Sequence, residues 1–132
     1  MRLPRQCEIA VDLLVFCAMN PNDLVTTRDA GNFANASRDH AHQVAVRLVQ
    51  AQLLEGVRGR RGGIRLKRQP EKIVIGEVVR LMEPLFMPVV TPLRNVTFNN
   101  IVRQAMDAAF EVFNTFTIAD LAAQDHSRID PG

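Results

Sequence analysis

Between residues 26 and 68 the spacing of apolar residues changes from the helical period to the strand period, and this change constrains the fold most. The apolar residues that recur three or four positions apart are Ala41, Val44, Ala45, Leu48, Val49 and Leu53. They predict a helix from Ser37 to about Leu54 with one apolar face. The segment VRGRRGGIRLKR (57–68) then has three glycines between short runs that alternate apolar and basic residues. It predicts a two-stranded hairpin directly after the helix.

A second, shorter helix is expected just before the first. Thr26 or Thr27 can cap a helix from Arg28 to Ala34, the residues NAS form a tight turn, and Ser37 caps the next helix. Two helices joined by so short a turn are typical of a helix-turn-helix. The residues of the longer helix that point away from its apolar face are Arg38, Asp39, His42, Gln43, Val46 and Arg47.

The remaining segments complete a mainly α fold. Residues 7–20 are apolar nearly all round, which predicts a buried helix, and another helix starts near Ile75 and ends at Pro84. Prolines at 84, 88 and 92 exclude a regular helix between them. A long helix from about Leu93 to Phe116 follows, and Thr117 caps one or two further turns. We therefore predict a winged helix-turn-helix with a two-stranded β wing and a long C-terminal dimerisation helix.

This order of elements predicts four parts. They are a winged-helix DNA-binding domain (1–84), a linker (85–92), a dimerisation helix with a short terminal helix (93–123), and a flexible tail (124–132). The seam expected to pair with a partner helix consists of Val102, Met106, Ala109, Phe113 and Phe116.

Charge is divided unevenly along the chain. Residues 1–70 carry 11 Lys and Arg against 6 Asp and Glu, whereas residues 71–132 carry 5 against 8. A basic half indicates a polyanionic partner, because each Lys or Arg that neutralises a phosphate releases a counterion. Taken alone, the basic hairpin is equally typical of a solvated loop without a specific partner. The helix-turn-helix beside it favours double-stranded DNA.

The candidate DNA contacts lie on both elements of this unit. Arginine can pair with guanine and glutamine with adenine in the major groove, and the hairpin cations can reach the backbone or the minor groove. The predicted DNA-binding residues are Thr27, Arg28, Ser37, Arg38, His40, His42, Gln43, Arg47, Arg58, Arg60, Arg61, Arg65 and Lys67.

Neither catalysis nor metal binding is expected. His40 and His42 are two residues apart, which is not the spacing of a helical metal pair, and no reacting set of side chains stands out. Cys7 and Cys17 would lie about 15 Å apart on one helix, too far for a disulfide. We expect both to be buried in a reducing compartment, with Cys7 the candidate redox thiol near a helix N-terminus. No apolar run is long enough to span a membrane, so we predict a cytoplasmic protein. Because no reacting set of side chains stands out, we also predict that it is not an enzyme.

Several stretches together resemble a known family. They are MRL at the start, SRDHAHQVAVRL (37–48), VRGRRGGIRL (57–66), IGEVVRLMEPL (75–85) and TIADL (117–121). The chain resembles the bacterial Rrf2 family of winged-helix transcription regulators, most of all its nitric-oxide-sensing branch. The resemblance implies a homodimer on a pseudo-palindromic operator, usually acting as a repressor.

The chain departs from that family at the cofactor site. The resemblance implies three cysteine ligands between the EP motif and the long helix, with an acidic ligand near the N-terminus. Here residues 85–102 contain no cysteine, although Glu8 stands near the acidic position and Asn100 near the last cysteine. Because iron–sulfur clusters need thiolate ligands, we predict no family-type cluster and no other cofactor. The signal is left open among a small molecule, a thiol at Cys7 and constitutive DNA binding. The alternative function is an interaction module that heterodimerises with a cluster-bearing paralogue.

Overall fold

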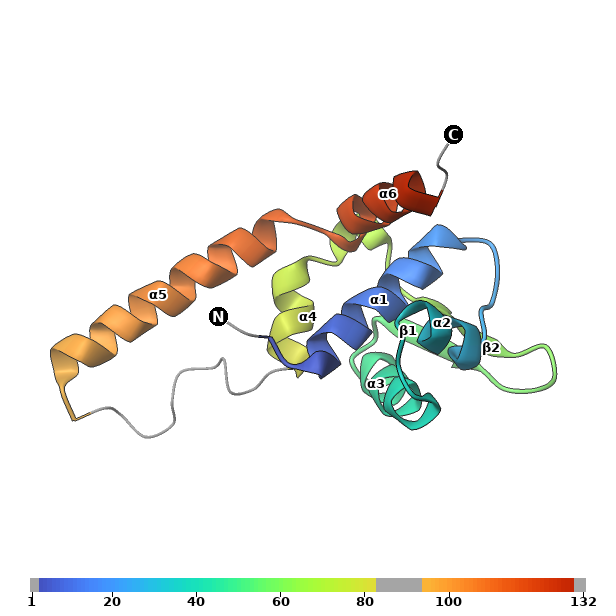
Figure 1. Ribbon diagram of the computed structural model, residues 1–132, viewed down its shortest axis with the longest axis horizontal. Coiled ribbons are helices and arrows are strands. Elements are labelled where there is room, and N and C mark those ends of the chain that lie inside the picture. The colour runs from blue at the N-terminus through green and yellow to red at the C-terminus, as the bar shows by residue number, and fades with distance from the viewer. Residues whose placement is uncertain (1–2, 83–93, 130–132) are drawn as a thin grey trace.

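The computed structural model describes residues 3–82 and 94–129 of the chain. The elements in order are α1 (Arg5–Met19), α2 (Thr27–Phe33), α3 (Arg38–Gln50), β1 (Leu54–Val57), β2 (Gly63–Leu66), the 3-10 helix η1 (Pro70–Lys72), α4 (Ile75–Met82), α5 (Val96–Thr115) and α6 (Ile118–Ile129). Figure 1 shows helices gathered around α1, a hairpin on one side and α5 extending from the other. The predicted fold class, a mainly α winged helix-turn-helix with a two-stranded wing, is confirmed.

Helix α1 is the centre of the hydrophobic core. Leu13 and Leu14 are fully buried, and α2, α3, α4 and α6 all pack against this helix. The sequence predicted this burial from the nearly uniform apolar character of the segment. The helix begins at Arg5 rather than Cys7, because Pro4 in an extended conformation precedes the first helical residue.

Helix α3 ends at Gln50, before the predicted end at Leu54. Gln52 adopts a φ of 67°, and the Leu53 amide donates back to the Leu48 carbonyl at 3.0 Å. A left-handed residue closes a helix in this way because it satisfies the last carbonyl groups. The early stop releases Leu53 and Leu54 into the core, where both are buried.

The wing is an antiparallel pair in which Leu54 lies opposite Leu66 and Val57 opposite Gly63. Its base is fixed to the loop before α2. The Val25 amide donates to the Ile64 carbonyl at 3.0 Å, and the Ile64 amide donates to the Val25 carbonyl at 2.7 Å. The hairpin is therefore attached to the helix-turn-helix by backbone hydrogen bonds.

The chain turns sharply between α5 and α6. The Ile75 amide donates to the Phe116 carbonyl and the Ile118 amide donates to the Ile73 carbonyl, each at 2.9 Å. Ile118 is fully buried in the core around α1, so α6 packs with the winged domain rather than with α5. The helix also continues to Ile129, whereas the sequence predicted a flexible tail from residue 124.

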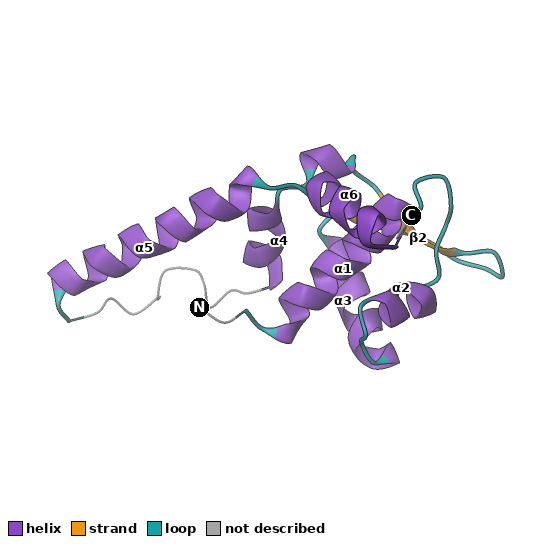
Figure 2. Cartoon of the chain, turned by 45° about the horizontal axis from the view of Figure 1, so that its top comes forward, coloured by secondary structure: helices purple, strands orange, loops and turns teal. Residues whose placement is uncertain are grey.

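Helix α5 projects away from the rest of the molecule in two views (Figures 1 and 2). It is attached near its C-terminal half, where the guanidinium of Arg80 lies 4.1 Å from the ring centroid of Phe110. Gly76 of α4 also lies against Asn114, so close that a β-carbon at residue 76 would collide with the Asn114 amide. The predicted linker, 85–92, lies outside the described residues.

Candidate nucleic-acid interface

The helix-turn-helix is organised by a side-chain cap at the start of each helix. The Thr26 hydroxyl accepts a hydrogen bond from the Asp29 amide at 3.0 Å, and the Ser37 hydroxyl accepts one from the His40 amide at 3.2 Å. Of the two candidate caps of α2, Thr26 is therefore the one used, which leaves Thr27 in the first turn. Ser37 keeps its hydroxyl proton available as a donor, since its oxygen is the acceptor in the cap.

The turn between the two helices is held from α1. The Arg5 guanidinium donates to the carbonyl groups of Ala34 and Asn35 at 2.7 and 2.8 Å, and it forms an exposed ion pair with Glu8. Asn35 has a φ of 54°, so its carbonyl belongs to a tight left-handed turn. The Arg5 contacts were not predicted from sequence, because they join residues about thirty positions apart.

Glycine allows the two helices to approach closely. A β-carbon at Gly31 of α2 would lie 2.8 Å from the β-carbon of Ala41 on α3, closer than two such carbons can pack. A groove remains at the outer side of this contact. Thr27, Arg28, Arg38 and His42 all line it, so four of the predicted DNA contacts from two helices face one hollow.

The outer face of α3 is polar except for one residue. Ala41, Val44, Ala45 and Leu48 are buried on its inner face. The exposed residues on the other side of the helix are Arg38, Asp39, His40, His42, Gln43 and Val46. The structure thus leaves the predicted reader residues Arg38, His40, His42 and Gln43 accessible from solvent.

Arg47 differs from this group because its side chain is engaged within the protein. We predicted a DNA contact, but its guanidinium donates to the Gln6 side-chain oxygen at 3.1 Å and to the Leu81 carbonyl at 2.6 Å. These bonds join α3 to the start of α1 and to the end of α4. The long side chain turns back along the helix flank, so DNA could bind Arg47 only in exchange for these partners.

The wing presents three cations that are not paired with acids. Arg58, Arg60 and Arg61 are exposed, and no ion pair involves them among the residues that the structure describes. Gly59 has a φ of +115°, which lets the hairpin bend between them.

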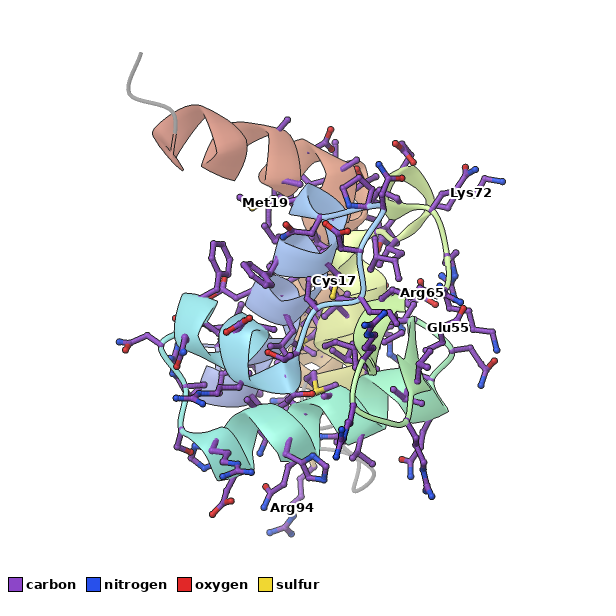
Figure 3. All side chains as sticks on the ribbon, turned by 90° about the vertical axis from the view of Figure 1, so that its right-hand side faces the viewer. Cys17, Met19, Glu55, Arg65, Lys72 and Arg94 are labelled. Atoms are coloured by element: carbon purple, nitrogen blue, oxygen red, sulfur yellow. The ribbon has the colours of Figure 1, made fainter. Side chains whose placement is uncertain are left out.

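The two remaining predicted wing contacts are engaged within the protein. Arg65 forms an ion pair with Glu55 across the strands at 3.2 Å, and Figure 3 shows these two side chains side by side. Lys67 donates to the side-chain oxygen of Gln52. Both side chains are exposed, so DNA could bind them only in exchange for these partners.

Helix α5 carries a broader apolar surface than the predicted seam. Val102, Met106, Ala109 and Phe113 are half-buried, and Phe116 is 48% exposed. A neighbouring row is exposed throughout and consists of Phe98, Ile101, Ala105, Ala108 and Val112. The apolar spacing in the sequence had also included Ala105 and Val112, but not Phe98, Ile101 or Ala108. The three- and four-residue spacing of the whole row is nonetheless visible in the sequence. In the structure α4 contacts the opposite side of α5 through Phe110, so this row remains exposed.

Both cysteines lie in the core. Cys7 is 1% exposed and Cys17 is 3% exposed, and neither forms a disulfide. Burial raises the pKa of the Cys17 thiol to about 12 because the charged thiolate would lose its hydration. Reactive thiols are at least partly exposed, so the burial of Cys7 argues against the predicted redox role. Figure 3 shows Cys17 enclosed by the surrounding elements.

Among residues 3–82 and 94–129, no three His, Cys, Asp or Glu side chains come together as a metal site. In the same ranges no helix is both long enough and apolar enough to cross a membrane.

Comparison with known proteins agrees with this geometry. Residues 3–124 match the model of the Rrf2 family, described as an iron-dependent transcriptional regulator. The transcriptional regulator NsrR of Bacillus licheniformis is 31% identical over 97% of either chain. Protein aau3 of Rhizobium meliloti is 33% identical over 92% of this chain and 84% of its own.

Two solved structures share the fold. CymR, the global cysteine regulator of B. subtilis, superimposes with a TM-score of 0.80 at 22% identity, covering 94% of this chain and 98% of that one. The T. potens protein IscR gives a TM-score of 0.79 at 19% identity, covering 98% and 91%. At such low identity these structures establish the common fold alone.

Proposed function

This chain belongs to the Rrf2 family of DNA-binding transcription regulators, which are not enzymes, and from that premise we propose how it binds its operator. The outer face of α3 enters the major groove while Arg58, Arg60 and Arg61 of the wing contact the adjacent backbone or minor groove. The observation that supports this arrangement best is the set of three unpaired wing cations beside a helix with an exposed polar face. We propose that the bound protein represses transcription. It acts in the cytoplasm, the compartment that holds bacterial DNA.

Replacing Arg60 and Arg61 with alanine should weaken binding to duplexes of any sequence. Each phosphate contact contributes about 0.9 to the slope of log affinity against log salt, so losing two should reduce that slope by up to about 2. Fluorescence anisotropy of labelled duplexes over a range of salt concentrations measures the slope.

The matched control for the wing variant is Lys72→Ala. Lys72 is also exposed, but it lies at the end of the molecule away from α3 (Figure 3). Its removal should leave the slope as in the wild type. A wing variant whose salt dependence equals that of the control would contradict the proposed wing contact.

The DNA-binding unit is proposed to be a homodimer joined through α5. The exposed row on this helix is apolar along its length, and Ile101 and Val112 are 56% and 60% exposed. Such a face on a projecting helix is stable in water when a second copy covers it. Dimer symmetry would present two α3 helices to a pseudo-palindromic operator.

The parts of the chain differ in one respect from the boundaries expected from sequence. We propose that residues 1–84 form the DNA-binding domain together with α6, because Ile118 is buried in the same core. The segment 85–92 then links this domain to α5, which alone forms the dimerisation part.

The residues present do not fit an iron–sulfur cluster. The chain has two cysteines, both are buried on α1, and the segment that carries the ligands in the resembling proteins has none. Cluster iron needs several thiolates at one place, and a thiol buried in the core cannot supply one without unfolding. We therefore propose that this family member regulates transcription without a cluster.

Protein purified in the absence of oxygen should be colourless. Without thiolate ligands there is no charge-transfer absorption in the visible range, and bound iron should not exceed that of a chelator-treated sample. The visible spectrum and metal analysis of the same preparation measure both quantities. A brown, iron-loaded protein would overturn this proposal while leaving the DNA-binding proposal intact.

A further inference from the structure

Large apolar side chains are exposed at few places on this molecule. In the described residues seven are strongly exposed, and five of them, Val96, Phe98, Ile101, Val112 and Phe116, belong to α5. The other two are Val46 on α3 and Val57 at the end of β1 in the wing. Single exposed apolar residues are common, but these two both lie on elements that carry proposed DNA contacts.

Val46 occupies the reading face of α3. It is 40% exposed and follows His42 by four residues and Gln43 by three, so the three side chains form one outward patch. Ala45 and Leu48, on either side of it in sequence, point into the core. Val46 is the only apolar member of the exposed outer face of this helix.

The major groove offers one apolar group that such a side chain can contact, the 5-methyl group of thymine. The other base edges present hydrogen-bond donors and acceptors, which an isopropyl group would desolvate without replacing their bonds. We propose that Val46 contacts a thymine methyl in each half-site and so selects thymine at that position. This inference rests on the proposed placement of α3 in the major groove.

The position of that thymine follows from helix geometry. Val46 and Gln43 are about one helical turn apart, roughly 5 Å along the axis. Base pairs are spaced by about 3.4 Å. The selected thymine is therefore about one or two base pairs from the base that Gln43 contacts, and Gln43 itself is suited to adenine.

The test removes the methyl group from the DNA and then the isopropyl group from the protein. Wild-type protein first selects its preferred duplex from a random pool. Each symmetric pair of thymines in that duplex is then replaced by deoxyuridine, and affinity is measured by fluorescence anisotropy at one salt concentration. At one pair of positions binding should weaken about fourfold per half-site, or roughly fifteenfold in all, as expected for one buried methyl group in each.

Two further measurements assign that effect to Val46. With cytosine at the sensitive positions, 5-methylcytosine should bind more tightly than unmodified cytosine, because the methyl group is in the same place. The variant Val46→Ala should bind the thymine and deoxyuridine duplexes equally. Val57→Ala is the matched control, and it should keep the full discrimination because the minor groove displays no methyl group.

Each alternative outcome is decisive. If wild type binds the selected duplex but no deoxyuridine substitution weakens binding, the methyl contact is refuted and the DNA-binding proposal stands. If Val46→Ala discriminates as well as the wild type, another residue reads the methyl group. If no sequence is selected from the pool, the proposed function itself is wrong.

Discussion

Replacing both Ile101 and Val112 with glutamate should convert the protein into a monomer and weaken its operator binding by at least about 100-fold. Two carboxylates would have to be desolvated in the middle of the α5 interface, which a helix pair does not tolerate without partners. A monomer also loses the gain from binding two half-sites at once, which commonly amounts to 10²–10⁴. Light scattering on a sizing column measures the mass, and fluorescence anisotropy measures affinity for the full operator.

The control for this variant places the same charges on the opposite face of α5. Asn100 and Arg103 are both exposed, and at about 100° per residue they lie on the other side of the helix from Ile101 and Val112, so their replacement with glutamate should leave mass and affinity unchanged. A dimeric Ile101→Glu/Val112→Glu protein would show that the exposed apolar row is not the interface. A monomeric wild type would instead favour the heterodimerising interaction module.

The helix-turn-helix and the wing could be predicted because their signals are local. The caps Thr26 and Ser37, the apolar spacing of α3 and the glycines of the hairpin act over a few residues each. The structure shows all of these elements where the sequence placed them, with the end of α3 shifted to Gln50. The earlier end of α3 depends on Gln52 adopting a left-handed backbone conformation. Glutamine does not favour that conformation, so the sequence could not predict it.

The role of Arg47 could not be predicted because it depends on partners far along the chain. The helical period places residue 47 at the border between the inner and outer faces of α3. From there a long side chain can point either toward solvent or back against the protein. Gln6 and the Leu81 carbonyl decide the matter, and they are 41 and 34 residues away. The same reason explains the missed contacts of Arg5 with the helix-turn-helix turn.

The sequence predicted an apolar surface on α5, but it did not indicate which part of that surface stays exposed. The apolar residues of α5 span a wide sector of the helix surface. Their spacing alone does not show which side of that sector another helix covers. The ring of Phe110 packs beneath Arg80 of α4, and its centroid lies 5.7 Å from the ring centroid of Phe113. The side of α5 that carries Phe110 therefore faces α4. The edge with Ile101 and Val112 is left exposed. The burial of Cys7, which the sequence did predict, follows from the packing of other helices around α1.

Replacing Leu48 with alanine should lower the free energy of unfolding by about 2–5 kcal/mol. Leu48 is fully buried on the inner face of α3, in the core formed with α1, so truncation removes apolar contacts and leaves a cavity. The midpoint of thermal denaturation should fall by roughly 10 °C. Because a dimer's stability depends on concentration, both proteins must be compared at the same protein concentration by circular dichroism.

Val46→Ala is the matched control for this effect, because it lies two residues away on the opposite face of the same helix. At 40% exposure Val46 contributes little to the core, so its loss should change unfolding by about 0.5 kcal/mol or less. The two variants should therefore separate stability from recognition. Leu48→Ala should keep the preference for thymine over deoxyuridine when measured well below its lowered midpoint, whereas Val46→Ala should keep stability and lose that preference. Equal destabilisation by both variants would mean that α3 does not present the inner and outer faces described for it.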